Sequence, residues 1–160
     1  MSTAQTPKQF SLYTVIAAVV AAVAAWGSMA LNLEVWVMFA GFIAWFTRPT
    51  SVQESLNAMI CLWLGIALAA ISHKMTGAMI PTLGTLALPV VVFLVAILIV
   101  GLRATSPVNN MLTWFLGMVT FFAADKGITI ETFIYLLSAT AIGGFAGWSC
   151  HTLNKRFANA

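Results

Sequence analysis

Long apolar runs alternate with short polar segments along almost the whole chain. The apolar runs occupy residues 10–31, 33–47, 56–72, 83–102, 111–124 and 132–150. Only helices and closed barrels satisfy their backbone hydrogen bonds in lipid, and these runs lack the alternation of apolar and polar residues that barrel strands show. The pattern therefore predicts an all-α membrane protein with six transmembrane helices.

The segments between the runs carry the helix breakers and most of the charge. They read 48-RPTSVQE-54, 73-HKMTGAMIP-81, 103-RATSPVN-109 and 125-DKGITIE-131. Proline, glycine and polar residues in such clusters mark loops. No segment is left over for a soluble domain, so we expect residues 1–160 to form a single integral membrane domain.

Composition and charge strengthen the membrane prediction and argue against nucleic acid as a partner. Hydrophobic residues make up 61% of the chain and charged residues only 7%, against roughly 25% charged residues in soluble domains. The net charge of +3 comes from cations that are spread singly, whereas a nucleic-acid backbone is bound by clustered cations. We therefore expect the surface of the protein to contact the lipid bilayer.

The positions of the basic residues predict the topology. With the N-terminus inside, five cations face the cytoplasm and two face outward. The cytoplasmic ones are Lys8, Arg48, Arg103, Lys155 and Arg156, and the outer ones are Lys74 and Lys126. Because cytoplasmic loops carry the excess of Lys and Arg, we expect a multi-pass protein with both termini in the cytoplasm.

Two motifs with the same spacing indicate a duplication. The stretches 32-NLEVW-36 and 110-NMLTW-114 each place an Asn four residues before a Trp, and a shift of 78 residues superposes them. The same shift pairs Arg48 with Lys126, Gly65 with Gly143 and His73 with His151. It defines repeats at about residues 10–73 and 83–151. Three crossings per repeat is an odd number, so the second repeat would be inverted, as in many transporters.

The run 26-WGSMALNLEVWVMFAGFIAWFTRP-49 and the later 143-GGFAGW-148 resemble the YcdZ-like family of small bacterial inner-membrane proteins, domain of unknown function 1097. The likeness lies in the Trp, Gly and Phe spacing around the second predicted helix and in a Gly-rich sixth helix, and it spans most of the chain. The resemblance implies six helices and a location in the bacterial inner membrane. It carries no catalytic residues, so the function has to be sought in the residues themselves.

The second and fifth predicted helices are unusually short. Residues 32–48 and 110–124 rise only about 22 to 26 Å, against a hydrocarbon core of roughly 30 Å. Short segments at corresponding places in two repeats indicate a transport site, because a helix that begins inside the protein points free N–H groups at a ligand. The alternative is that the Asn residues cap helices at the membrane surfaces and that the Trp residues belong to aromatic belts. If the short helices form a transport site, the candidate solute-binding residues are Asn32, Trp36, Asn110 and Trp114.

The other candidate lining residues are mostly uncharged. Glu34 lies at the start of the second predicted helix, where an acid either complements the helix dipole in solvent or lines a pore vestibule. The further candidates are Asn57, Trp63, Thr120, Trp45, Phe121 and Thr140, and each also suits packing or an interhelical hydrogen bond. Apart from Glu34, which lies at a helix start, the predicted helices hold no Asp, Glu, Lys, Arg or His at their centres. A facilitator for a neutral solute needs none.

The chain shows no pattern typical of an enzyme or of a metal site. Cys61 and Cys150 lack CxxC spacing and are interpreted as small packing residues. His73 and His151 follow the last apolar turns of different predicted helices and would lie on opposite sides of the membrane. Without a Ser, His and Asp triad, a nucleotide loop or paired carboxylates, we expect neither catalysis nor a cofactor.

Small residues at four-residue spacing predict close helix contacts. They are Ala17, Ala21 and Ala25 in the first run and Ala139, Gly143 and Gly147 in the last. Such residues allow helix backbones to approach closely, within a subunit or between subunits. Because the bundle would be thin, we also expect a homo-oligomer.

Together these features predict a small inner-membrane channel or facilitated permease for a small neutral or weakly polar solute. The main alternative is a non-transporting helical scaffold or accessory subunit, which the small-residue faces would also suit. A third hypothesis is an ion-coupled exporter of hydrophobic compounds, which the lack of buried charge disfavours. A wettable path beside the two short helices would distinguish the first hypothesis from the second.

Overall fold

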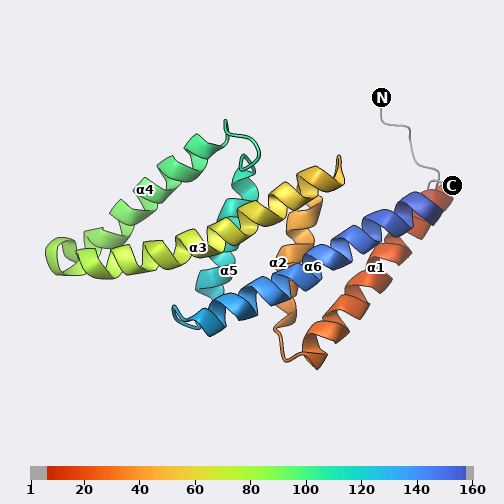
Figure 1. Cartoon of the computed structure of the whole chain (residues 1–160), viewed down its shortest axis with the longest axis horizontal. Helices are drawn as coiled ribbons and strands as arrows, with labels where there is room; N and C mark the ends of the chain where they lie inside the picture. The colour runs from red at the N-terminus through yellow and green to blue at the C-terminus, as the bar shows by residue number, and fades with distance from the viewer. Residues whose placement is uncertain (1–6, 158–160) are drawn as a thin grey trace.

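The computed structural model describes residues 7–157, and all regular structure in that part of the chain is helical (Figure 1). The α-helices are α1 (Pro7–Ala30), α2 (Val35–Phe46), α3 (Val52–Leu83), α4 (Ala87–Leu102), α5 (Met111–Ala124) and α6 (Ile130–Phe157). A short 3-10 helix, η1 (Gly84–Leu86), joins α3 to α4. The prediction of an all-α protein is confirmed.

Three stretches are long and apolar enough to cross a bilayer. By length and composition these are Pro7–Ala30, the continuous helical stretch Val52–Leu102, and Ile130–Phe157. The remaining helices are apolar but short, with 12 residues in α2 and 14 in α5, or about 18 and 21 Å at the usual helical rise. The chain is thus an all-helical membrane protein, and the second and fifth helices are short as predicted.

The short helices pack on long helices that are distant in the sequence. The most extensive helix contacts are those of α2 with α6 and of α3 with α5. Helix α1 flanks α6 and helix α4 flanks α3, so these two flanking helices lie on the outer sides of the assembly in Figure 1. The core is therefore built where α2 and α5 cross the two long helices.

Glycines bring the crossing helices into backbone contact. A Cβ on Gly41 or on Gly143 would overlap the main chain of the other helix at the crossing of α2 and α6. A Cβ on Gly65 or on Gly117 would do the same where α3 crosses α5. Both crossings are therefore closed by backbone-to-backbone packing that leaves no space for a larger side chain.

The predicted small-residue face of α6 packs inside the chain. Ala139, Gly143 and Gly147 are all buried, and a Cβ on Gly147 would lie 2.6 Å from Cβ of Trp45 in α2. The prediction of a helix-contact face is confirmed. Because α2 of the same chain covers this face, the face gives no argument for a homo-oligomer, which stays a prediction.

The prediction of a loop at residues 73–81 is wrong. Helix α3 continues through this segment and ends at Leu83, so Pro81 falls in its last turn, where few helical hydrogen bonds remain to be lost. The end is set by Gly84, whose φ of 55° is a conformation that favours glycine. The other three predicted loops are confirmed, at residues 47–51, 103–110 and 125–129.

The prediction that His73 and His151 follow the last turns of their helices is also wrong. Both lie inside helices, because α3 and α6 extend beyond their apolar runs to Leu83 and Phe157. The end of α6 is basic, as expected where cations complement the negative end of the helix dipole. The two cysteines are buried and unpaired, as predicted for packing residues.

Candidate functional site

At one end of the molecule the loop after α2 meets the start of α5. Asn110 is the N-cap residue of α5, and its Oδ1 accepts a hydrogen bond from the backbone N–H of Thr113 at 3.4 Å. Its Nδ2 donates to Oγ1 of Thr47 at 2.7 Å. The guanidinium of Arg48 donates to Oδ1 of Asn109 at 2.6 Å and to the carbonyl oxygen of the same residue at 3.1 Å. Asn110 is only 5% exposed, whereas the Arg48 side chain is 36% exposed. This end therefore has a buried helix cap beside a partly exposed guanidinium.

At the opposite end the loop after α5 meets the start of α2. Glu34 occupies the N-cap position of α2, but its side chain makes no capping hydrogen bond. Its carboxylate pairs with Nζ of Lys126 at 3.2 Å, and its backbone N–H donates to the hydroxyl of Tyr135 at 2.7 Å. The Lys126 ammonium also lies 4.7 Å from the centroid of the Tyr135 ring. The two charged side chains are 38% and 40% exposed, so water reaches this end.

The prediction that Asn32 and Asn110 are matching helix caps is wrong. Glu34, two residues further along, stands at the N-cap of α2, whereas Asn32 is exposed in the preceding loop. Its φ of 55° explains the residue type, because Asn tolerates this left-handed conformation better than most residues. Asn32 is therefore a residue of the turn before α2, and of the two Asn residues only Asn110 caps a helix.

The two tryptophans of the motifs also lie in different surroundings. Trp36 is 40% exposed, whereas Trp114 is 7% exposed and packs against Cys61 and Ile99. The indole N–H of Trp114 donates to the carbonyl oxygen of Val108 at 2.9 Å. Trp114 is therefore a structural residue of the α3, α4 and α5 packing, and its predicted role as a wall of a solute path has no support from its contacts.

Three of the further predicted site residues lie on two helices, α3 and α5. Thr120 is buried in α5, and its hydroxyl donates to the carbonyl oxygen of Leu116 in the same helix at 2.7 Å. Asn57 is half-buried near the start of α3. Trp63, half-buried on α3, donates from Nε1 to Oγ1 of Thr140 on α6 at 3.0 Å and lines a groove between these helices. The predicted residues thus do not converge on one site.

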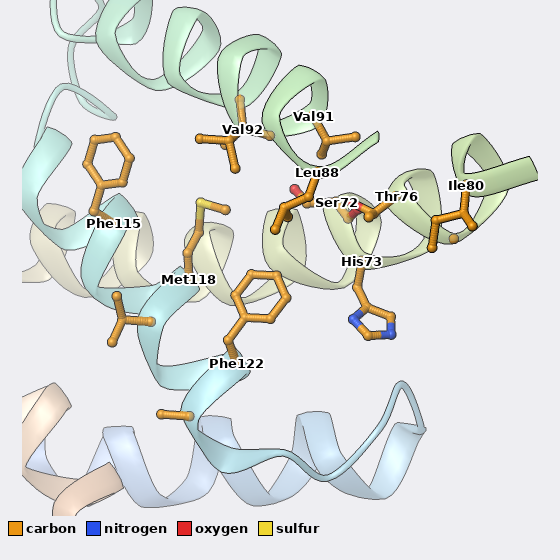
Figure 2. Close-up of a pocket in the computed structure, with 14 residues that line it drawn as sticks. Ser72, His73, Thr76, Ile80, Leu88, Val91, Val92, Phe115, Met118 and Phe122 are labelled. Carbon is orange, nitrogen blue, oxygen red and sulfur yellow. The ribbon is translucent and has the colours of Figure 1, made fainter. Parts of the chain in front are cut away.

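A groove of about 700 Å³ opens between α3, α4 and α5 (Figure 2). Its walls are mainly aliphatic and aromatic, and Figure 2 shows the ring of Phe122 facing the cavity from α5. One polar strip interrupts this lining, formed by Ser72, His73 and Thr76 of α3. The ring centroids of His73 and Phe122 are 6.2 Å apart. A volume of this size lies within the range of about 300 to 1,000 Å³ that is typical of small-molecule sites.

The hydroxyls of the polar strip are satisfied by their own helix. Ser72 donates to the carbonyl oxygen of Leu68 at 2.7 Å, and Thr76 donates to the carbonyl oxygen of Ser72 at 2.9 Å. Both oxygens retain acceptor capacity, while His73 is the ionisable side chain of the groove. The sequence prediction missed this strip because it assigned residues 73–81 to a loop. A helical interpretation would have placed Ser72 and Thr76 on one face.

A corresponding polar strip lies 78 residues further along, on α6. It consists of Cys150, His151 and Asn154. Nδ2 of Asn154 donates to Sγ of Cys150 at 3.3 Å. Oδ1 of Asn154 and Nε2 of His151 are buried without a hydrogen-bond partner among the described residues. Unlike the strip on α3, this one is largely buried, with Cys150 at 0% and Asn154 at 4% exposure.

These arrangements suit binding by shape and hydrogen bonding. Within residues 7–157, no three His, Cys, Asp or Glu side chains come together in a group that could hold a metal ion. The strip on α3 sets hydroxyl and imidazole groups beside the apolar lining of the groove. Such a lining recognises the outline and the hydrogen-bonding groups of a small molecule.

The fold, the lateral groove and the polar clusters at both ends define a small all-helical membrane protein. Over residues 14–155 the chain matches the family described as protein of unknown function (DUF1097), and it belongs to that family. The resemblance seen in the Trp, Gly and Phe spacing is thereby confirmed. No curated protein and no solved structure matches the chain.

Proposed function

We propose that this protein is a small permease, a channel or facilitated carrier, for small neutral or weakly polar solutes in the bacterial inner membrane. In this proposal the chain crosses the membrane six times as two inverted repeats, α1 to α3 and α4 to α6, with both termini in the cytoplasm. The observation that carries the proposal is reciprocal packing: the second helix of each repeat lies on the third helix of the other. Inverted repeats of this kind are the plan of many transporters.

Reciprocal contacts at the helix ends support the inverted arrangement. Arg48, which follows α2, contacts Asn109, the residue before the N-cap of α5, and Lys126, which follows α5, contacts Glu34, the N-cap of α2. The third helices also begin alike, because the hydroxyls of Ser51 and Thr129 each accept from a backbone N–H three residues later. These similar contacts at corresponding helix ends support the proposed repeat.

The course of the chain in Figure 1 supports six crossings. Successive helices alternate between downward and upward directions in this view, and α1 begins where α6 ends. The cations after α2 and α4 then lie on the same side as the termini, which agrees with the five-to-two division of the basic residues. A chain without Cys61 and Cys150 tests this topology: single cysteines at Thr105 and Gly127 should be labelled from opposite faces.

The lining of the groove between α3, α4 and α5 supports an uncharged solute. Its surface is apolar apart from Ser72, His73 and Thr76. Moving an ion into such a lining without a partner costs several kcal/mol or more by the usual estimates for buried charge. A molecule with one or two hydrogen-bonding groups and an apolar remainder meets no such cost.

Flux through reconstituted vesicles tests the proposal. Purified protein in liposomes should speed the equilibration of glycerol, urea or acetamide after an osmotic jump, measured by light scattering. Gly77 lines the groove, and a Cβ there would meet nothing within 4 Å. Gly77→Leu should therefore fill part of the groove without disturbing the fold and should lower the flux. Gly101→Leu is the matched control, because Gly101 on α4 is equally free of neighbours.

Two outcomes would contradict the proposal in different ways. If protein-containing vesicles equilibrate no faster than empty ones with any of these solutes, the protein is not a permease for this class. If flux is present but Gly77→Leu leaves it unchanged, the solute path lies elsewhere than in this groove.

The second candidate function is a non-transporting scaffold or accessory subunit. One observation favours it: the start and the interior of α5 are packed, because Asn110 and Thr120 are buried and hydrogen-bonded within the protein. A scaffold would show no flux, and its apolar flanking helices α1 and α4 would contact other membrane helices. Crosslinking from an exposed position on α4, such as Phe93, would then capture a specific partner.

A further inference from the structure

The groove between α3, α4 and α5 has polar groups on one side only. They belong to the strip of Ser72, His73 and Thr76 on α3, and the other lining residues are aliphatic, aromatic, methionine or glycine. No Asp, Glu, Lys or Arg is among the described lining residues, so nothing there would neutralise an ion of either sign apart from the imidazole. A ligand that fits this groove therefore has an apolar body and carries its polar atoms on one side.

Two groups of the strip are within reach of a ligand in the groove, the imidazole of His73 and the hydroxyl of Thr76. His73 is exposed and Thr76 is half-buried, whereas Ser72 is only 4% exposed. Figure 2 shows the imidazole beside the ring of Phe122, and the two ring centroids are 6.2 Å apart. His73 and Thr76 are three residues apart in one helix, so they share a face. They form one polar contact point at the edge of an apolar space.

The hydrogen-bonding capacity of these two groups limits what they can recognise. The Thr76 hydroxyl already donates its proton to the carbonyl oxygen of Ser72 at 2.9 Å, so it can only accept from a ligand. The His73 ring makes no hydrogen bond with the described part of the chain. A neutral imidazole has one donor nitrogen and one acceptor nitrogen. The polar contact point therefore suits a ligand group that both donates and accepts.

We propose that this groove binds uncharged hydroxyl compounds with an apolar body, phenols and the larger alcohols, and that His73 and Thr76 recognise the hydroxyl. The hydroxyl donates its proton to Oγ1 of Thr76 and accepts from the imidazole N–H, while the body packs against Phe122 and the aliphatic residues of α4. An ether of the same shape has no proton to donate and leaves Thr76 unpaired. The inference rests on the proposed permease function, since it names the class of solute that the groove would carry.

The chain has only two histidines, which makes the binding step directly measurable. The full-length protein is labelled with ¹⁵N-histidine in nanodiscs, and the imidazole nitrogens are followed by NMR at one fixed pH during titration with 4-methylphenol. We expect a saturable shift of the His73 signals. His151 lies on α6 and does not line the groove, so its signals should show no saturable change. Either His73→Gln or His151→Gln assigns the two sets of signals.

The matched probe is 4-methylanisole, whose methoxy oxygen accepts a hydrogen bond but has no proton to donate. After correction for partitioning into the lipid, its affinity should be roughly threefold to tenfold lower than that of 4-methylphenol, the usual worth of one hydrogen bond. Thr76→Val removes the accepting oxygen at nearly constant side-chain volume and should abolish this preference. Gly77→Leu should prevent saturation with both probes because it fills part of the groove, and Gly101→Leu should leave both affinities unchanged.

Three results would overturn the inference. The first is a set of His73 signals that does not saturate with 4-methylphenol, which is the result expected if acyl chains of the bilayer fill the groove. The second is equal affinity for the two probes, and the third is a preference for 4-methylphenol that persists in Thr76→Val. If Thr76→Val does not fold, the comparison of the two probes on the wild-type protein decides.

Binding and flux fail separately. If 4-methylphenol binds as expected but no solute crosses protein-containing vesicles faster than empty ones, the permease function is wrong and the assigned ligand class stands. If glycerol or urea crosses but the His73 signals do not respond to 4-methylphenol, the permease function stands and the assigned ligand class is wrong.

Discussion

The starts of the two short helices, α2 and α5, occupy corresponding places in the chain but are stabilised by different interactions. At the start of α5, Asn110 is buried, caps the helix and donates to Thr47. At the start of α2, Glu34 lies at the N-cap without a capping bond and pairs with Lys126 in partial contact with water. One end combines a buried helix cap with hydrogen bonds from the partly exposed Arg48, and the other is a half-exposed ion pair.

The difference predicts which of the two helix starts opens at the lower free-energy cost. A buried hydrogen-bond network is costly to break, because each separated group is left without a partner away from water. A half-exposed ion pair loses little when it opens, since water and salt replace the partner. We therefore expect local opening at the Glu34 end at lower cost than at the Asn110 end, and substitutions at four positions examine this expectation.

The largest effect should follow from Asn110→Leu. It removes the cap of α5 and leaves the buried N–H of Thr113 without an acceptor, at a cost of about 2 to 3 kcal/mol in unfolding free energy. Denaturation by SDS in mixed micelles measures the change. Asn110→Ser keeps a capping oxygen but cannot reach Thr47 and should cost about half as much. Equal stability of Asn110→Leu and the wild-type protein would remove the distinction between the two ends.

A smaller loss of unfolding free energy should follow from Arg48→Gln. The guanidinium donates to both oxygens of Asn109 and pairs with Glu54 at 3.3 Å, with a side chain 36% exposed. Because exposure screens such contacts, we expect a loss of about 1 kcal/mol. The two hydrogen bonds to Asn109 do not depend on Glu54, so raising NaCl should leave most of this loss in place. A loss that disappears in salt would mean that the ion pair with Glu54 carries it.

Lys126→Gln should have a still smaller effect, which depends on salt. The pair with Glu34 is more than a third exposed on both sides, so we expect at most about 1 kcal/mol at low ionic strength and less in 0.5 M NaCl. Parallel SDS titrations at the two salt concentrations measure the difference. A loss of unfolding free energy as large as that of Asn110→Leu would show that the two helix starts contribute equally to stability.

Asn32→Gly should have the smallest effect. Asn32 is exposed with φ at 55°, where glycine is unstrained, so the change should lie within a few tenths of a kcal/mol. Asn32→Val should cost about 1 kcal/mol, because a β-branched residue is strained at positive φ. A loss near 1 kcal/mol for the glycine variant would instead indicate a capping role for the Asn side chain.

The fold was largely predictable because its signals are local. Four of the six helices have the expected extent within a few residues, and the loops after Arg48, Arg103 and Asp125 follow the breakers in the sequence. Helix α6 runs beyond its apolar run to Phe157. The larger exception is the segment after Ser72. There, Pro81 and Gly77 suggested a loop, but contacts with α4 and α5 hold the segment as helix. Propensity is a weak prior that tertiary packing overrides.

The candidate site was less predictable because it depends on contacts between distant residues. Trp36 and Trp114 stand in the same local motif, yet one is exposed and the other is buried beneath α4. Trp45 and the glycines of α6 form a groove wall only because α2 lies on α6. No local pattern distinguishes these tryptophans, since in a membrane protein the lipid-facing and the core-facing residues are both apolar.

The sequence by itself determined that this protein is a helical membrane protein, where most of its helices run, that α2 and α5 are short, and which face of α6 makes close contacts. These properties follow from apolar run length, helix breakers and small-residue spacing, all read within one segment. The tertiary structure alone decided that Glu34 rather than Asn32 begins α2, that α3 extends to line a groove, and that Trp45 faces α6. Each of these depends on which helix lies beside which, and that choice is made by packing between segments far apart in the chain.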